Sequence, residues 1–515
     1  MNLYIFFTGP FLTVGGMQQY ILGKIKALKT IGWEIIVFAP QPCIGNSVYE
    51  ELNDYAYTGN DAFWYTPDCF SEHEKDIIFE NSIKAARVNI ENYEKICIES
   101  HFEIAAFWGE YFAYKMNAKH HFCAINELFR GENKLYEKYM DFFKFKLNRH
   151  EISGRVKQLF EGYLEIKDLP EYESWVIEKN PIEDVYSERI DTIKKEEYNI
   201  GLISRGEKDY VPNVLQAISD FCRKNKESQF LVVLVGDYTS RTNEIGRCFL
   251  ELQNVRVYST GNLVPIPKKL YEKLDVVLAN SAAAMFSAYQ NVPVIVVSHK
   301  EGFANGVLGY DCDFDESIYL KGRDPDKKTV DLLEKILIKK EYNSQKPMLP
   351  EPVNEVDFHK KKLDYFNSNI PNSKNDYYHF HTKYSIKEIR PDLYKNSKKY
   401  KYRYLNSKEL NKAKIVVFGA GREGIDCINW LNGIGKDVLF VADNDVAKMN
   451  TEIENIRVVG PDEIRKIEED YFVIIANLSC YEEIEKQLMD SYAIPEERCI
   501  PYRYLQDWPM IGIYY

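Results

Sequence analysis

The sequence predicts an α/β fold built from doubly wound parallel sheets: two Rossmann-like domains that face a cleft, followed by a smaller Rossmann-like domain. Three observations predict this class. Short segments such as 229–235 and 471–476 are almost wholly apolar. Amphipathic helical stretches such as 211–225 alternate with them, and glycine-containing loops follow several of them. Strands that are apolar throughout are typical of parallel sheets that helices cover on both faces.

The length of 515 residues supports about three domains, because a single core rarely grows beyond about 250–300 residues. We expect residues 1–195 and 196–325 to form the first two domains. Residues 326–408 lack long apolar periodicity and are rich in Lys, Tyr, Asn and Pro, which predicts a helical tail and a partly flexible linker. Residues 409–515 are then the third domain.

Composition excludes several classes of protein. The net charge of −12 leaves no basic excess to neutralise a phosphate backbone, so we expect no nucleic-acid partner. The ten cysteines include no Cys-x-x-Cys pair, and we expect no metal site. No run approaches the roughly 18 apolar residues of a membrane span, and the first residues lack the basic region of a signal peptide. These features predict a cytoplasmic protein.

The first domain opens with a strand–loop–helix–strand unit. Its loop contains Gly15 and Gly16, and the helix that follows has apolar residues at helical spacing. The predicted strands of this domain are 3–8, 34–39, 93–100 and 120–126, and the predicted helices are 17–31, 102–116 and the charged stretch 127–175.

The second domain repeats the alternation of strand and helix. The segment QFLVVLV at 229–235 is its strongest strand, and small residues dominate the helix that begins near Ala282. The predicted strands are 200–203, 229–235, 255–258, 275–279 and 292–297, and the predicted helices are 211–225, 266–274 and 282–290.

The third domain carries a glycine-rich turn. Gly419, Gly421 and Gly424 form a Gly-x-Gly-x-x-Gly pattern between a predicted strand at 415–418 and a helix, and Asp443 ends the next strand. This spacing is the fingerprint of a nucleotide-binding Rossmann unit, and it makes these four residues the candidate cofactor-binding set. Two interpretations stay open, because the domain either binds a nucleotide or serves only structure and assembly.

Two segments carry a family resemblance: GPFLTVGGMQQYILGKIKALKTIGWEIIVFAP at 9–40 and LYEKLDVVLANSAAAMFSAYQNVPVIVV at 270–297. Over residues 1–320 the chain resembles glycosyltransferases of the GT-B fold, of the type that builds capsules and surface polysaccharides. The third domain is similar to small nucleotide-binding modules appended to sugar-modifying enzymes. The first resemblance implies transfer of a sugar from a nucleoside-diphosphate sugar, with no cofactor required for the transfer.

The resemblance also implies a donor site. Gly15 and Gly16 match a glycine loop near the donor diphosphate, and Arg205 and Lys208 match two cations that hold it. Residues Asn280, Ser281 and Ala282 lead into a helix whose small side chains let backbone N–H groups approach a phosphate. Ser281 has a second interpretation as only the N-cap of that helix.

This chain departs from the family at the donor sugar. The family normally carries two glutamates eight residues apart, and no Glu occurs between Lys273 and Lys300. The position of the second glutamate falls near Phe286 or Ser287. The departure leaves the ribose contact, the donor and the stereochemistry of transfer open.

Two polar residues at predicted strand ends are the candidate catalytic residues. His101 follows one strand and Glu127 follows another, so both lie at the edge of a parallel sheet where ligands bind. Glu127 is expected to act as a base or acceptor ligand, and His101 to orient the acceptor or the sugar. The alternatives are a helix cap for Glu127 and a satisfied strand-end histidine for His101. His120 and His121, placed before a strand, are interpreted as structural.

Three functions remain open at this point. The first is a glycosyltransferase that uses a glycan or lipid-linked acceptor, which allows peripheral contact with the inner face of the cell membrane and a homo-oligomer. The second is an NAD-dependent oxidoreductase or epimerase that works through the third domain. The third is a decayed transferase that binds a partner without catalysis.

Overall fold

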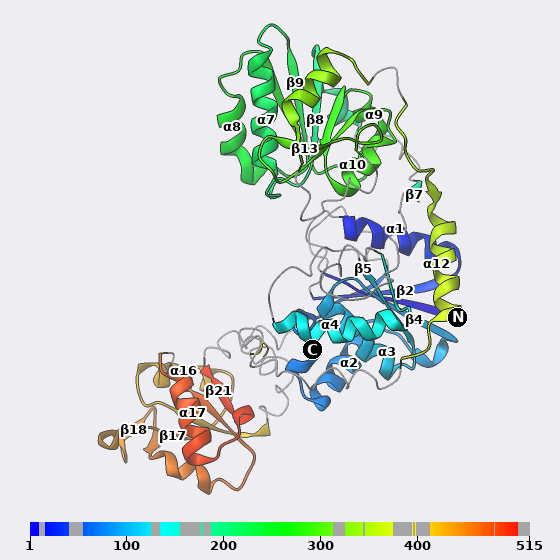
Figure 1. Cartoon of the computed structure of the whole chain (residues 1–515). Coiled ribbons are helices and arrows are strands. Elements are labelled where there is room, and N and C mark those ends of the chain that lie inside the picture. Colours follow the sequence, from blue (N-terminus) through cyan, green and yellow to red (C-terminus); the bar gives the residue numbers. More distant parts are fainter. Residues whose placement is uncertain are drawn as a thin grey trace. The chain divides into compact units, whose positions relative to one another are not determined.

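The computed structural model describes residues 1–9, 16–40, 55–124, 134–154, 177–178, 187–312, 325–342, 346–373, 394, 397, 412–477 and 479–502. Contacts divide the chain into two compact units, Met1–Gly59 with Asn89–Asp376 and Asn60–Val88 with Tyr377–Tyr515. The first unit contains two large sheets and a two-stranded one, and the second unit contains a further large sheet (Figure 1). No described helix is long and apolar enough to cross a membrane.

The first sheet has six parallel strands in the order β3-β2-β1-β4-β5-β6. This is the strand order of a doubly wound fold, in which the order reverses between β1 and β4. All but the first residue of β1 are buried, which explains why the strand is apolar throughout. The strands are β1(Asn2–Phe7), β2(Trp33–Ala39), β3(Ala56–Gly59), β4(Lys95–Ser100), β5(Lys119–Ala124) and β6(Ile152–Gly154).

Helices cover both faces of the first sheet. On one face, Tyr4 and Phe6 pack with Ile21 and Ile25 of α1(Gly16–Thr30) and with Leu363 of α12(Glu355–Asn369). On the other face, the rings of Phe7 and Phe38 contact Phe112 of α3(Glu103–Lys115). A further helix, α4(Lys134–Asn148), precedes β6.

Helix α12 lies alongside α1, although some 330 residues of chain separate them (Figure 1). The packing is close at Gly23, where an added Cβ would lie 2.1 Å from Glu355 Oε1. Just after the end of α12, Ser373 N–H donates to the carbonyl oxygen of Ala118 at 2.7 Å. The segment predicted as a linker therefore contains a helix that completes the core of the first domain.

The second sheet has the order β10-β9-β8-β11-β12-β13-β14, parallel through β12 and antiparallel at β13 and β14. Alternate residues of β9 pack into two separate cores, one on each face of the sheet. This burial on both faces explains the unbroken apolar run of β9. The strands are β8(Tyr198–Ile203), β9(Phe230–Val235), β10(Val255–Gly261), β11(Val276–Ala279), β12(Val294–Val297), β13(Phe303–Val307) and β14(Lys327–Lys328).

Several helices accompany the second sheet, and the longest is α7. Its strong amphipathic pattern buries Val211, Leu215, Ile218 and Cys222 at helical spacing. The helices are α6(Ser187–Asp191), α7(Val211–Lys224), α8(Thr242–Phe249), α9(Lys268–Tyr271), α10(Ser281–Ala288) and α11(Thr329–Leu333), which continues as a π-helical turn, η7(Glu334–Ile338). Two short strands, β7(Ile177–Glu178) and β15(Val353–Asn354), form a separate parallel pair.

The third sheet has the order β18-β19-β17-β16-β20-β21, parallel except for β18. Its strands are β16(Lys414–Phe418), β17(Val438–Ala442), β18(Glu452–Ile453), β19(Ile456–Val459), β20(Tyr471–Ile475) and β21(Cys499–Pro501). The helices whose bounds are described in the second unit are α2(Glu72–Ala85), α16(Arg422–Gly433) and α17(Tyr481–Tyr492). The predicted class of doubly wound α/β sheets is therefore confirmed three times, whereas the cleft between the first two sheets stays a prediction.

Three sequence-based expectations about secondary structure were wrong. Residues 127–175 are not helical throughout, because β6(Ile152–Gly154) follows α4 and pairs with β5. His120 and His121 lie within β5(Lys119–Ala124), which agrees with the predicted strand at 120–126 and corrects their placement before a strand. The antiparallel strand β13(Phe303–Val307) was not predicted, because its sequence FANGV contains turn-forming residues. The predicted domain boundaries themselves stay predictions.

Candidate functional site

The carboxyl edge of the second sheet brings two predicted donor-site segments together. Ile203, the last residue of β8, pairs with Ala279, the last residue of β11. The loop that carries Arg205 and Lys208 and the helix that begins at Ser281 therefore leave the sheet from adjacent strands, at the same level. In open α/β sheets this edge is where ligands bind.

The loop after β8 is held by close backbone contacts. Gly206 N–H donates to the carbonyl oxygen of Asp237 at 3.0 Å, and an added Cβ at Gly206 would lie 2.4 Å from that oxygen. The Arg205 side chain is 35% exposed and lies 3.2 Å from the carboxylate of Glu207. Lys208 is exposed at the following turn. Both cations are therefore placed at the edge of the sheet and open to solvent.

The beginning of α10 differs from the predicted cap. The N-cap is Asn280 rather than Ser281, and its side chain makes no capping bond: Oδ1 accepts from the Ser281 hydroxyl at 2.7 Å, and Nδ2 donates to the carbonyl oxygen of Val297 at 2.7 Å. Ser281 is the first residue of the helix and has a φ of 50°, a left-handed conformation that costs a non-glycine residue roughly 1–3 kcal/mol. Ala282 follows within the helix. The first turn carries no acidic side chain, so its N–H groups present an uncancelled positive end.

The remaining donor-site glycines are only partly described. Gly16 is the exposed first residue of α1. Gly15 lies outside the described residues, as does the candidate catalytic Glu127.

In the first domain, β4 and β5 carry polar residues on both faces of the sheet. The two strands pair in parallel with Glu99 opposite His121 and Ile98 opposite His120. Because side chains alternate along a strand, Glu99, His101 and His121 share one face, while Ser100 and His120 share the other. The short sequences ESH and HH therefore contribute to two separate buried networks.

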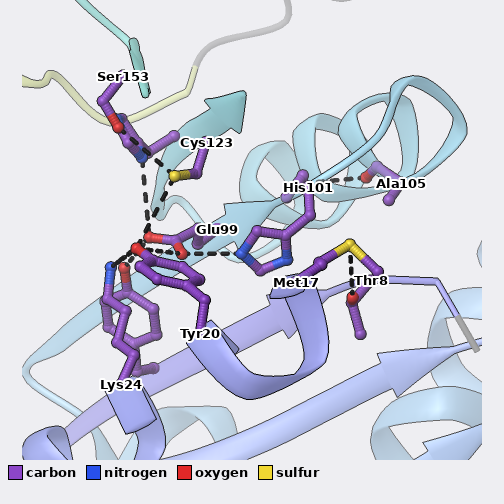
Figure 2. Close-up of polar contacts among 12 residues, drawn as sticks. Thr8, Met17, Tyr20, Lys24, Glu99, His101, Ala105, Cys123 and Ser153 are labelled. Atoms are coloured by element: carbon purple, nitrogen blue, oxygen red, sulfur yellow. Dashed lines mark hydrogen bonds and ion pairs between the residues drawn. The ribbon is translucent and has the colours of Figure 1, made fainter. Parts of the chain in front are cut away.

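The first network surrounds the carboxylate of Glu99 (Figure 2). The Lys24 ammonium of α1 forms a buried ion pair with it, and the Tyr4 hydroxyl donates to Oε2 at 2.7 Å. His101 Nε2 lies 2.9 Å from Oε1, and His121 Nδ1 lies 3.8 Å from Oε2. Burial by itself disfavours the charged form, but Lys24 and the two histidines hold the pKa of Glu99 well below its usual range. Glu99 is therefore an ionised carboxylate inside the protein.

His101 is fully buried directly after the end of β4, with an exposed fraction of 0%. Its ring stacks on Phe6 with centroids 5.9 Å apart, and its backbone N–H donates to the carbonyl oxygen of Phe7 at 3.2 Å. Nε2 is bonded to Glu99, whereas Nδ1 is buried without a hydrogen-bond partner among the described residues. A purely structural histidine would be expected to bond through both ring nitrogens, whereas only Nε2 of His101 does so among the described residues.

The second network surrounds Glu110 of α3. His120 Nδ1 lies 2.6 Å from Glu110 Oε2, and His120 Nε2 lies 2.8 Å from Ser100 Oγ. The Lys146 ammonium donates to the same carboxylate at 2.6 Å, and the hydroxyl of Ser373 donates to Oε1 at 2.5 Å. Although burial opposes ionisation, Lys146 and His120 hold the pKa of Glu110 far below its usual range. Both nitrogens of His120 have partners, which fits the structural role predicted for it.

The third domain has a cavity of about 520 Å³ at the carboxyl ends of its parallel strands. Three of its four predicted cofactor-binding residues line it, namely Gly419, Gly421 and Asp443; the fourth, Gly424, packs beneath the turn, where an added Cβ would lie 2.0 Å from the carbonyl oxygen of Gly419. The other lining residues include Arg422, Glu423, Asn444, Lys448, Asn477, Ser479 and Gln487.

Asp443 connects the glycine turn to the next strand. Its Oδ2 accepts from Ala420 N–H at 2.6 Å and its Oδ1 from Asp445 N–H at 2.8 Å, while the Lys448 ammonium lies 3.3 Å away. Burial opposes ionisation, but the two N–H groups and Lys448 hold the pKa of Asp443 below its usual range. Asp443 thus stabilises the turn itself in addition to lining the cavity.

Sequence reasoning missed Glu99 and Lys24 of the first network, and Arg422 and Lys448 of the third-domain cavity. The available signal for Glu99 was a charged residue at the end of an apolar strand, in the sequence KICIES. Lys24 gave no such signal, because a lysine on an amphipathic helix is usually exposed. Among the described residues, no cluster of His, Cys, Asp and Glu side chains could hold a metal ion.

Comparisons with known proteins add a family match for the third domain. A family model described as C2185-like, N-terminal, matches residues 411–500. No curated protein sequence matches the chain.

Solved structures with similar folds are distant. UDP-GlcNAc 2-epimerase from Neisseria meningitidis, bound to UDP-GlcNAc, is 12% identical, with a TM-score of 0.41 over 72% of this chain and 100% of its own. A glycosyltransferase from Rickettsia africae is 16% identical, with a TM-score of 0.37 over 79% and 99%. HepE of Anabaena, in complex with UDP and glucose, is 11% identical, with a TM-score of 0.40 over 77% and 99%.

Proposed function

We propose that the chain is a glycosyltransferase that moves a sugar from a nucleoside-diphosphate sugar to a glycan or lipid-linked acceptor. The observation that carries the proposal is the pairing of Ile203 with Ala279, which places the Arg205–Lys208 loop beside the uncapped beginning of α10. Cations and free backbone N–H groups at one sheet edge suit a diphosphate. The left-handed Ser281 at this point supports a functional role, because strained backbone concentrates at ligand sites.

In this proposal the carboxyl edge of the second sheet stabilises the leaving group. As the bond between the sugar and the diphosphate breaks, negative charge develops on the diphosphate oxygens. Arg205, Lys208 and the N–H groups at the start of α10 are placed to stabilise that charge. In the first domain, Nδ1 of His101 is the group that takes the proton of the attacking acceptor hydroxyl. Glu127 remains a second candidate for contact with the acceptor.

Release of free nucleotide from a panel of UDP-, GDP- and dTDP-sugars, measured by mass spectrometry, tests the proposal. We expect one donor class to be turned over. Arg205→Ala and Lys208→Ala should each lower kcat/KM by about 100-fold, the typical cost of removing one group that stabilises developing charge.

The matched control is Arg223→Ala, which removes an exposed cation of α7 in the same domain, one that forms an ion pair with the exposed Asp220. This variant should keep its activity. If all three variants behave alike, or if no donor is turned over by the unmodified chain, the proposed transfer is wrong. Normal donor binding without any turnover would instead favour the decayed transferase.

A second proposal concerns the third domain, and it is favoured by the cavity at its glycine turn. We infer that this cavity binds a nucleotide, with phosphate at the beginning of α16 and the exposed Arg422 beside it. Titration calorimetry of the full chain with UDP, ADP and NAD⁺ tests this, with Arg422→Ala as the weakening variant. Arg457→Ala, an exposed cation on β19 of the same domain, is the control. Binding of NAD⁺ alone would favour the oxidoreductase alternative.

A further inference from the structure

We propose that Glu99 is a positioning residue that fixes the ring of His101 in one tautomer, with Nε2 protonated and Nδ1 open as a proton acceptor. The inference rests on the proposed sugar transfer and deepens it. It states how the group that takes the proton of the acceptor hydroxyl is oriented.

The tautomer follows from the charge of Glu99. An ionised carboxylate can only accept hydrogen bonds, so the 2.9 Å contact with Oε1 requires a proton on His101 Nε2. In a neutral imidazole the other nitrogen then carries the lone pair. Lys24 supports this arrangement indirectly, because its ammonium pairs with Glu99 and keeps the carboxylate ionised. A protonated Glu99 could donate instead and permit the opposite tautomer.

The ring has little freedom to turn. Phe6 stacks on one face at an interplanar angle of 15°, and the edge contact with the Tyr20 ring has a centroid distance of 6.0 Å. Figure 2 shows the ring between Glu99 and Met17, with its second nitrogen on the side of Met17 and Thr8. Thr8 follows β1, and Met17 is the second residue of α1. Nδ1 therefore lies toward the carboxyl edge of the sheet.

The comparison with His120 separates this arrangement from a purely structural one. His120 is equally buried beside the same pair of strands, but both its nitrogens have partners in Glu110 and Ser100. His121 and His359 also have unpartnered nitrogens, yet they lie inside β5 and inside α12. Of these histidines, His101 is the one that follows a strand end. The Met17 side chain next to it has three rotatable bonds and can move aside for a substrate.

The proposed transfer exchanges one bond of the anomeric carbon for another. The acceptor hydroxyl oxygen forms a bond to the anomeric carbon of the sugar while the bond from that carbon to the diphosphate oxygen breaks. The electron pair of the broken bond leaves with the nucleoside diphosphate. The hydroxyl proton moves to Nδ1, and the resulting imidazolium is stabilised by Glu99 through Nε2–H. The titratable groups in contact with His101 are Glu99 on β4 and Tyr20 on α1. Those in contact with Glu99 or Tyr20 in turn are Lys24 on α1, Tyr4 on β1, His121 and Cys123 on β5 and His359 on α12.

Nitrogen NMR of the full chain tests the tautomer without any substrate. With ¹⁵N-labelled histidine rings, and His101→Gln to assign the signal, we expect the neutral ring to carry its proton on Nε2 and not on Nδ1. In Glu99→Gln the amide can donate as well as accept, so a mixture of tautomers is expected. A protonated Nδ1 in the unmodified chain, or an unchanged tautomer in Glu99→Gln, would overturn the inference.

Kinetics test the consequence for transfer. Glu99→Gln should lower kcat by about 100-fold while KM for the donor stays within about threefold, and Glu99→Asp should recover part of the loss. Glu110→Gln is the matched control, because it neutralises an equally buried carboxylate with the same kinds of partners on the other face; its kcat should stay near normal. Equal losses in the two variants would show that Glu99 acts only through stability. A chain without turnover contradicts the sugar transfer alone, since the NMR result is independent of it.

Discussion

Glu99 of β4 and Glu110 of α3 bind the two neighbouring histidines of β5 from opposite faces of the first sheet. Glu110 lies 2.6 Å from His120 Nδ1, and Glu99 lies 3.8 Å from His121 Nδ1. Each carboxylate also pairs with one buried lysine. The two networks thus have similar chemistry, but only the Glu99 network leads to an unpartnered histidine nitrogen beyond a strand end.

The buried histidines predict that the first domain loses stability in mild acid. Burial lowers the pKa of His120 and His121 to about 4 and that of His359 to about 3. In the unfolded chain each titrates near pH 6.5, so between pH 6.5 and about 4 the unfolded chain binds more protons. The free energy of unfolding should fall there by up to about 1.4 kcal/mol per pH unit for each histidine. Hydrogen exchange of the β5 amides measures this fall.

His359→Phe should flatten the same dependence. Both ring nitrogens of His359 are buried with no hydrogen-bond partner in the described part of the chain, and its ring packs against that of Tyr20. An apolar ring removes the unsatisfied nitrogens, so stability at pH 7 should stay equal or rise by about 1 kcal/mol. The slope between pH 6.5 and 4 should lose the contribution of one histidine. A slope equal to that of the unmodified chain would contradict the assignment of this titration to His359.

Lys146→Met should destabilise the first domain strongly. The ammonium lies 2.6 Å from Glu110 and 2.5 Å from Glu151, and its side chain is 1% exposed. Its removal leaves the buried carboxylate of Glu110 without its lysine and Glu151 with Arg149 alone, and breaking a buried pair in this way typically costs about 3–5 kcal/mol. Urea unfolding of the full chain measures the loss.

Lys224→Met is the control for that variant. Lys224 lies 2.5 Å from Glu334, but its side chain is 57% exposed. Water screens such a pair, so stability should hardly change. Similar losses in the two lysine variants would show that distance, and not burial, decides the effect.

The glycine turn of the third domain predicts unequal effects of two alanines. An added Cβ at Gly424 would lie 2.0 Å from the carbonyl oxygen of Gly419, whereas one at Gly421 meets no atom within 4 Å. Gly424→Ala should therefore destabilise the third domain by about 1–3 kcal/mol, and Gly421→Ala should be tolerated. Hydrogen exchange of the β16 amides distinguishes them. A tolerated Gly424→Ala would mean that the turn differs from the one described.

Ser281→Gly should stabilise the second domain. Ser281 has a φ of 50°, which glycine adopts without the steric cost that a side chain incurs. The gain, reduced by the greater freedom of glycine in the unfolded chain, should be about 1 kcal/mol, and Ser281→Val should have the opposite sign. Thermal unfolding measures both variants. If the strain serves donor binding, Ser281→Gly should also weaken binding of the nucleotide product.

The fold class could be predicted from the sequence because parallel strands buried on both faces must be apolar throughout. The run of β9 and the glycine turn after β16 are local signals that need no knowledge of distant residues. Strand β6 and antiparallel β13 could not be found in this way. β6 is an edge strand and β13 lies next to the edge strand β14, and their short sequences, ISG and FANGV, form strands only because neighbouring strands offer hydrogen bonds.

In the candidate sites, too, local features could be predicted from the sequence and long-range contacts could not. The order of residues alone placed Arg205, Lys208 and His101 after strands, and a parallel sheet gathers its strand ends at one edge. Sequence could not pair His101 with Glu99 and Lys24, since the contact depends on how α1 packs over β4. It also could not place His359 and Ser373 in the first domain, hundreds of residues from their partners in α1 and α3.

The sequence by itself thus determined three doubly wound sheets, the positions of Arg205, Lys208 and His101 after strands and the glycine fingerprint, because apolar periodicity and turn chemistry are local. Only the tertiary structure decided which polar groups became buried together. Burial excludes water, and an ion or imidazole in that environment takes its charge and tautomer from the few groups in contact with it. For His101 those groups come from β1, β4 and α1, which only folding brings together.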